Sequence, residues 1–209
     1  MTPGQRAPLR ADAARNAERI QRTARAVFAD LGPDAPLEEI ARRADVRIRT
    51  LFNHFPSKAD LVRAALDQAI AEDLEPAAER ALADDDPLHG LLALVEAAMG
   101  LAARELNTLA AARNAGVLTA EVSTPFRESL ATLARRAQDA GLLRPDLVPD
   151  DLMRIMAMLT STLWTMEPGS NGWRRYLALV FEGLAPAVAK PLPAPVAPLK
   201  DSRTGNWSL

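Results

Sequence analysis

The chain has 209 residues, a formal net charge of −2 and no cysteine. The missing thiols exclude disulfides, thiolate metal sites and cysteine nucleophiles. Two histidines, His54 and His89, leave little material for a zinc site or a Ser-His-Asp triad. Apolar residues make up 48% of the sequence, which is enough for one sizeable core or two small ones.

The apolar pattern predicts an all-α protein. Alanine and leucine dominate, and no stretch alternates apolar and polar residues with period two. No apolar run approaches the roughly 20 residues that span a bilayer, and the N-terminus lacks a signal-peptide core. We therefore expect a soluble cytoplasmic protein with no membrane partner.

Charge is distributed unevenly along the chain. Residues 1–63 contain twelve Lys or Arg and eight Asp or Glu, so the remainder is acidic. A basic N-terminal part on an acidic body fits a protein that touches nucleic acid with one end.

The first elements are an arm and a long helix. Residues 1–11 contain Pro, Gly and Arg without helical periodicity, so we expect a flexible arm. Helical spacing of apolar residues then predicts a helix from Asp12 to Asp30. Gly32 and Pro33 end it, as glycine and proline do after a helix.

Residues 37–73 predict two short helices around a tight turn, followed by a third helix. Apolar residues at spacings of three to five let the short helices bury a shared corner. Basic residues dominate the outside, which is typical of a helix-turn-helix (HTH) that enters DNA. A solvated face on an ordinary helical hairpin would give the same charge pattern, so the pattern alone leaves both readings open.

A resemblance decides between them. The stretch VRIRTLFNHFPSKADLV, from Val46 to Val62, resembles the signature of the TetR family of bacterial transcriptional regulators. The match runs from Val46 through the Thr-Leu-aromatic-x-His-Phe run to the Pro-Ser-Lys turn, and it continues upstream through residues 16–32. The resemblance implies a one-component regulator, a repressor that binds a palindromic operator in double-stranded DNA as a homodimer and is released by a small, mainly apolar effector.

The resemblance also places a recognition helix at about residues 47–54. Arg47 and Arg49 have forked donors suited to guanine, Ile48 can contact a thymine methyl, and Asn53 can reach a base or a phosphate. The remaining expected DNA contacts are Thr50, Phe52, His54 and Lys58. Phe52 stands where the family commonly has tyrosine, so a hydroxyl contact to phosphate is lost. His54 is equally well read as a packing residue.

Beyond the recognition helix, Ser57 begins a capping box and a helix from Ser57 to Leu74. Residues 75–87 contain Pro76 and three consecutive aspartates, which predicts a hinge loop. The aspartates lack the alternating spacing of a calcium loop, so we expect no metal. Further helices are predicted at residues 88–101, 104–115, 121–140, 149–166 and 173–185, the first two being either separate or one bent helix.

The predicted domains are therefore an N-terminal three-helix HTH domain (residues 12–74) and a larger C-terminal helical bundle for ligand binding and dimerisation (residues 75–185). Residues 186–209 contain five prolines and predict a disordered tail. The helix at residues 149–166 is apolar nearly all round, which indicates burial on more than one face. By resemblance, it forms a dimer interface with the last helix, through Leu152, Ile155, Leu159, Leu163, Leu177, Val180, Phe181 and Leu184.

A ligand pocket is expected inside the bundle, because its middle helices carry mostly alanine and leucine with few bulky residues. Candidate lining residues are Met99, Asn107, Thr108, Met156, Thr160 and Trp164. Adaptable methionines that simply fill a core explain the same pattern. No cofactor is expected. No GxSxG, HExxH or phosphate-loop motif is present, so the sequence does not favour an enzyme. The alternative function is a helical adaptor without specific DNA binding.

Overall fold

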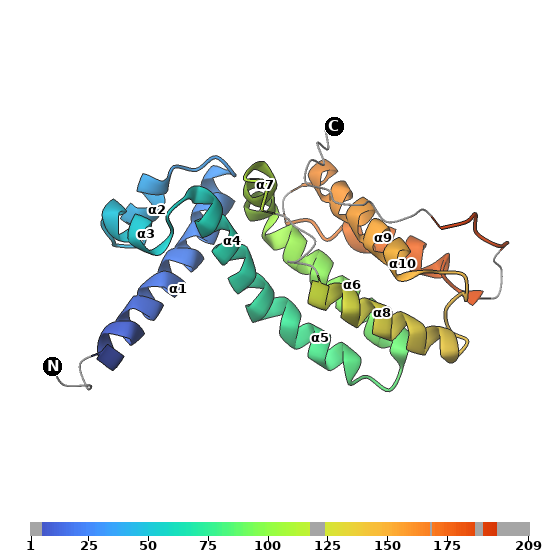
Figure 1. The fold of residues 1–209 in the computed structure, drawn as a ribbon. Coiled ribbons are helices and arrows are strands. Elements are labelled where there is room, and N and C mark those ends of the chain that lie inside the picture. The colour runs from blue at the N-terminus through green and yellow to red at the C-terminus, as the bar shows by residue number, and fades with distance from the viewer. Residues whose placement is uncertain (1–5, 118–123, 168, 187–189, 196–209) are drawn as a thin grey trace.

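A computed structural model describes residues 6–117, 124–167, 169–186 and 190–195. Every regular element in these ranges is helical, which confirms the predicted all-α class. Figure 1 shows a head at one end and a body at the other. None of the described helices is long and apolar enough to cross a membrane.

The head contains α1 (Arg6–Leu31), α2 (Leu37–Arg43), α3 (Ile48–His54) and α4 (Lys58–Ala69). Its core buries apolar side chains that repeat at helical spacing, including Ile20 and Phe28 of α1, Leu51 of α3 and Leu61 of α4, which are fully buried. α4 begins as the sequence predicts, because the Ser57 hydroxyl accepts a hydrogen bond from the Asp60 N–H at 3.1 Å. α1 begins earlier than expected, so the prediction of an arm through residue 11 is wrong for residues 6–11.

A further helix, α7 (Leu106–Asn114), lies between the head and the body (Figure 1). Ala111, Ala112 and the following Val117 are buried in the head core together with side chains of α1 and α4. α7 lies in the range predicted for the C-terminal domain, and in the structure it completes the core of the head.

The predicted hinge at residues 75–87 is wrong over its first part. α4 continues through a π-helical turn (Ile70–Leu74) into α5 (Glu75–Leu82), and only residues 83–86 form a loop. Pro76 follows the π-helical turn, in which the Glu75 N–H bonds to the Ile70 carbonyl five residues earlier. Prolines and π-helical turns are both usual places where a long helix bends without ending. The Asp86 side chain then caps α6 by accepting from the N–H groups of Leu88 and His89.

The body is built around α6 (Pro87–Arg104), which packs against α5, α8 (Thr124–Asp139), α9 (Pro149–Thr162) and α10 (Trp173–Glu182). α6 and α7 are separate helices, broken at Glu105. α9 ends in a 3₁₀ turn, Leu163–Thr165. The apolar faces of these helices form a second core, in which Leu94, Leu133 and Trp173 are fully or almost fully buried.

Part of the predicted tail is held against the body. The Arg144 guanidinium, itself paired with Asp146, donates to the Lys190 carbonyl at 3.0 Å. Asp146 in turn accepts from the Leu192 N–H at 2.9 Å. The prediction of a disordered tail is therefore wrong for residues 190–192, and most of the tail lies outside the described residues.

Candidate nucleic-acid interface and junction cavity

The turn between α2 and α3 sets the angle between these two helices. The Val46 N–H donates to the Ala41 carbonyl at 3.0 Å, and the Asp45 N–H donates to the Arg42 carbonyl at 3.2 Å. Asp45 has φ 52°, a left-handed conformation that Asp tolerates better than most residues. These two bonds form a Schellman motif, which ends α2 sharply. After the motif, only Arg47 separates Val46 from the first residue of α3, Ile48.

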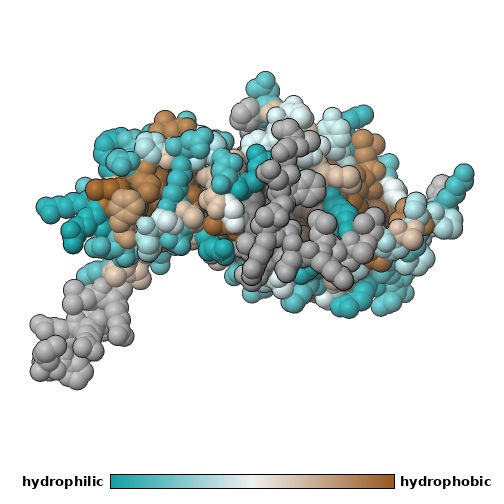
Figure 2. All heavy atoms as spheres, turned by 45° about the horizontal axis from the view of Figure 1, so that its top comes forward, coloured by the Kyte–Doolittle hydropathy of each residue, from teal (hydrophilic) through white to brown (hydrophobic). Residues whose placement is uncertain are grey.

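α3 has one buried face and one exposed face. Leu51 is fully buried and anchors the helix in the head core, whereas Arg47, Arg49 and Asn53 are exposed. Phe52 is 43% exposed. Figure 2 shows that the outer end of the head carries hydrophilic side chains beside apolar ones. Among the described residues, the Arg47 and Arg49 side chains have no hydrogen-bond or ion-pair partner, so their guanidinium groups are available to a ligand.

The neighbouring arginines are held within the protein. Glu39 accepts from Arg42 at 2.7 and 2.8 Å and from Arg43 at 2.7 Å. Arg43 also pairs with Asp30. Hydrogen bonds from Arg42 and then Arg43 lower the pKa of Glu39 to about 2. The basic surface of the head thus divides into arginines that stabilise α2 and arginines that remain unpaired at α3.

The other expected DNA contacts are more enclosed. Ile48, Thr50 and His54 are half-buried, and His54 packs beside the Phe55 ring with 6.2 Å between centroids. The Lys58 ammonium donates to the Ala35 carbonyl at 3.1 Å and lies 5.7 Å from the centre of the Phe28 ring. It has further donors, so this bond leaves it able to contact a phosphate.

Ion pairs join the head to the body around Glu105, the buried residue between α6 and α7. The Arg25 guanidinium of α1 donates to Glu105 at 2.7 Å and to Glu72 at 2.8 Å. The Thr108 hydroxyl donates to Glu105 at 2.9 Å. Burial disfavours the charged form of Arg25, but hydrogen bonds to Glu105 and Glu72 outweigh burial and raise the pKa of Arg25. Glu72 is shared with Arg22.

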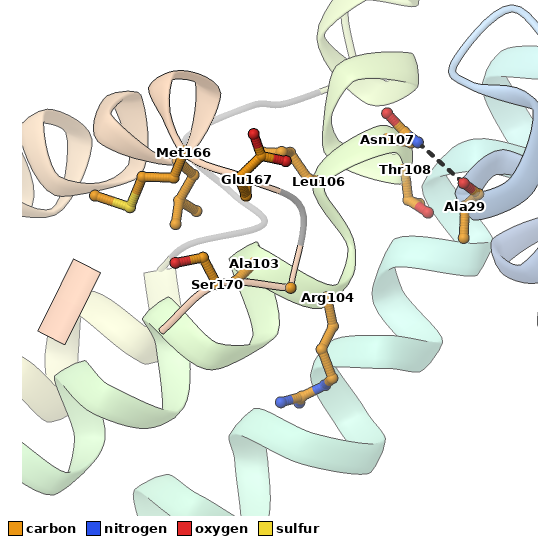
Figure 3. Close-up of a pocket in the computed structure, with 11 residues that line it drawn as sticks. Ala29, Ala103, Arg104, Leu106, Asn107, Thr108, Met166, Glu167 and Ser170 are labelled. Atoms are coloured by element: carbon orange, nitrogen blue, oxygen red, sulfur yellow. Dashed lines mark hydrogen bonds between the residues drawn. The ribbon is translucent and has the colours of Figure 1, made fainter. Parts of the chain in front are cut away.

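Beside this ion-pair group lies a cavity of about 290 Å³, partly open to solvent, which we call the junction cavity. It is lined by Ala29 of α1, Ala103 and Arg104 of α6, Leu106, Asn107 and Thr108 of α7, and Leu163, Met166, Glu167, Gly169 and Ser170 of the segment between α9 and α10. Figure 3 shows the Asn107 amide directed at the Ala29 carbonyl, to which it donates at 3.3 Å. The cavity therefore has walls from both the head and the body.

Two of the six predicted ligand residues, Asn107 and Thr108, line this cavity. Met99 and Met156 are buried in the body core, and the Thr160 hydroxyl points to the Met99 sulfur at 3.9 Å. Trp164 is 46% exposed and stacks against Arg113, at 5.4 Å from the guanidinium carbon to the ring centre. None of these four lines the junction cavity. Sequence reasoning missed Glu167 and Ser170, although their polar, Gly-rich turn between two apolar helices was a usable signal.

Only some of the predicted dimer residues lie near the surface of the protomer. Leu152, Leu159, Leu163, Leu177 and Leu184 are buried in the body core of the protomer itself, so they are not available to a partner. Ile155, Val180 and Phe181 are half-buried. The large apolar side chains that α9, its 3₁₀ turn and α10 expose are Met158, Trp164, Tyr176 and Leu179. The described residues contain no group of three or more acidic or histidine side chains that could hold a metal ion.

Comparisons with known proteins agree with this architecture. Residues 20–65 match the model of bacterial regulatory proteins of the tetR family, and residues 86–186 match the SbtR-like transcriptional regulator C-terminal domain. No curated protein matches the chain in sequence.

The solved structures that resemble this chain are also transcriptional regulators. A TetR transcription regulatory protein from Mycobacterium vanbaalenii is 28% identical, with a TM-score of 0.61 over 85% of this chain and 99% of that one. A TetR transcriptional regulator from Streptomyces coelicolor is 27% identical, with a TM-score of 0.56 over 82% and 99%. A transcriptional regulator from Saccharomonospora viridis, 22% identical, shares the fold with a TM-score of 0.65 over 81% and 96%.

An HTH head on a helical body defines a DNA-binding regulator. The chain belongs to the TetR family of transcriptional regulators, whose members are DNA-binding proteins and not enzymes.

Proposed function

We propose that the protein is a cytoplasmic repressor that binds a palindromic operator as a homodimer and leaves it when a small molecule occupies the junction cavity. The exposed face of α3 is the observation that carries the proposal. There, Arg47 and Arg49 project without an internal partner among the described residues, while the arginines of α2 are paired with Glu39 and Asp30. Family membership favours this function over that of a helical adaptor.

The two arginines at α3 are the proposed base-reading residues, because guanidinium groups pair with guanine through two hydrogen bonds. Arg47→Ala and Arg49→Ala should each reduce discrimination between operator and random DNA by about 1–3 kcal/mol. Lys58→Ala should instead weaken binding to all sequences and flatten its salt dependence. Arg135→Ala, an exposed arginine on α8, is the matched control.

The operator can be found by selecting bound sequences from random DNA. A homodimer with two-fold symmetry should select an inverted repeat. The centres of its half-sites should lie about one turn of the DNA helix, or a multiple of one turn, apart. If both arginine variants keep full discrimination, base reading by α3 is refuted.

The proposed dimer surface is the exposed side of α9 and α10, not the leucines that face the body core. A second copy is the natural occupant, because a two-fold interface uses the same patch on both protomers and the family pairs through helices of the body. Met158 is 59% exposed and Leu179 is 56% exposed, which is a large apolar surface for a monomer to leave in water.

Leu179→Glu or Met158→Glu should produce monomers and abolish tight operator binding. Leu82→Glu on α5, at 37% exposure, is the control that adds the same charge elsewhere. Light scattering measures the oligomeric state. A wild-type monomer at micromolar concentration would rule out the homodimer, and dimeric variants would rule out this surface.

The junction cavity is the proposed effector site because it touches both parts of the molecule. Its α7 wall belongs to a helix that completes the head core, and its α1 wall is in the head itself. A ligand there can change DNA affinity only by its different affinities for the DNA-bound and free arrangements of the heads. Most of the cavity wall is apolar, and Arg104, Asn107, Thr108, Glu167 and Ser170 supply its polar groups.

A further inference from the structure

The polar side chains of the junction cavity offer both acceptors and donors. One N–H of the Asn107 amide donates to the Ala29 carbonyl, and the Thr108 hydroxyl donates to the buried Glu105 carboxylate. Asn107 keeps its carbonyl oxygen and its second N–H for a ligand, and the Ser170 hydroxyl, which accepts from the Gly172 N–H at 3.1 Å, keeps its own hydrogen to donate. Hydrogen bonding therefore does not select the class of ligand, and the charge at the cavity has to.

The unpaired charge at the cavity favours a cationic ligand. Glu167 is exposed, and its carboxylate has no hydrogen bond or salt bridge with any described residue. Arg104, the other charged lining residue, donates to Asp73 at 2.8 Å and points away from Glu167 (Figure 3). The neighbouring cluster around Arg25 is paired with its own carboxylates. The unpaired charge at the cavity is therefore negative.

The rest of the lining is apolar. Ala103, Leu106, Leu163 and Met166 cover the walls between the polar groups. At the packing density of protein interiors, a volume of about 290 Å³ holds about a dozen non-hydrogen atoms. This is the size of a small metabolite with a short hydrocarbon or aromatic body.

We propose that the junction cavity takes a small organic cation, an amine or ammonium compound with an apolar body, and that Glu167 is its counter-charge. This proposal rests on the proposed function only in naming the cavity as the effector site. An anionic ligand fits less well, because the charge of Arg104 is already balanced by Asp73 and the unpaired Glu167 carboxylate would repel the ligand.

Three probes of nearly equal size and different charge test the proposal: 2-phenylethylamine, 2-phenylethanol and phenylacetate. Their binding to the full chain is measured by ligand-detected NMR and calorimetry without DNA. The amine should bind about five- to tenfold more tightly than the alcohol, because it gains one hydrogen bond to a carboxylate whose charge is weakened by exposure to solvent. Phenylacetate should bind most weakly.

Three substitutions test whether the probes bind in the junction cavity and whether Glu167 is the counter-charge. Glu167→Gln keeps the shape of the side chain and should remove the preference for the amine over the alcohol. Glu128→Gln, which neutralises an exposed carboxylate of α8, should leave that preference intact. Ala103→Phe fills the cavity and should abolish binding of all three probes, provided that circular dichroism shows the variant to be folded.

Three results would overturn the proposal: no saturable amine binding at millimolar concentration, alcohol or acid binding as tight as the amine, or an amine preference that survives Glu167→Gln. Amine binding that survives in folded Ala103→Phe would move the site elsewhere and overturn it as well. Because these measurements contain no DNA, their failure is distinguishable from a failure of operator binding. Selective amine binding without any effect on operator affinity would refute the effector role and leave the ligand assignment standing.

Discussion

The contact between Arg25 and Glu105 should contribute strongly to stability, and Glu105→Ala tests it. The Glu105 side chain is 9% exposed and that of Arg25 is 17% exposed, so the pair is well shielded from water. Truncation removes the acceptor of two hydrogen bonds, from Arg25 at 2.7 Å and from Thr108 at 2.9 Å. Deleting one partner of a buried pair costs about 3–5 kcal/mol, because the remaining charge stays buried.

We expect the low end of that range, because Arg25 keeps its second carboxylate, Glu72, at 2.8 Å. The expected loss is about 3 kcal/mol of unfolding free energy, or a Tm lower by about 6–12 °C for a chain of this size. Glu105→Gln keeps an acceptor for both donors and should lose about half as much.

Thermal and urea unfolding at one fixed protein concentration measure the effect, since the stability of a dimer depends on concentration. Glu128→Ala, which removes an exposed carboxylate, should stay within about 0.5 kcal/mol of the wild type. A cycle with Arg25→Ala should give a coupling energy above about 1 kcal/mol. If Glu105→Ala loses less than about 1 kcal/mol, or the cycle shows no coupling, the pair does not stabilise the junction.

Three further outcomes are expected. Asp45→Asn keeps a residue that tolerates φ 52° and removes a negative charge beside α3, so DNA affinity measured by fluorescence anisotropy should rise about two- to fivefold, less at high salt. Ser57→Ala removes the cap on the Asp60 N–H and should lower the unfolding free energy by about 1 kcal/mol in urea. The hydrogen bond that the His89 ring donates to the Asp84 carboxylate raises the pKa of His89 above its usual 6.5, so this pair stabilises the fold below about pH 6.5 and stops doing so as pH rises through the raised pKa. Unfolding at about pH 5.5 and 8.5 should show that decrease, and His89→Gln should abolish it; an unchanged decrease would assign it to other groups.

Local signals were sufficient for the short helices of the head and for the cap that begins α4. The cap at Ser57, the apolar stripes of α1 and α4, and the short helices around Asp45 follow from rules that act within a few residues. The same rules failed at Pro76, because proline reads as a break although the helix continues past it through the π-helical turn at Ile70–Leu74.

The remaining errors concern which surface a helix meets. α9 is apolar nearly all round, so periodicity could not tell that Leu152 and Leu159 face the body core while Met158 is exposed. The alanines of α7 fit against any close neighbour, so the sequence could not assign them to the head. Glu167 was missed because a cavity depends on three segments that are far apart in the chain.

The burial of Ala111, Ala112 and Val117 in the head core limits how the molecule can be divided. A fragment ending at residue 74 would expose the surface of α1 and α4 that these residues cover, so it should be a poorly folded DNA-binding unit. A chimera that joins this head to another regulator's body would inherit a foreign α7, whose small residues must match the groove on α1 and α4. Exchange of specificity between such proteins is therefore easier by changing the surface of α3 than by exchanging whole heads.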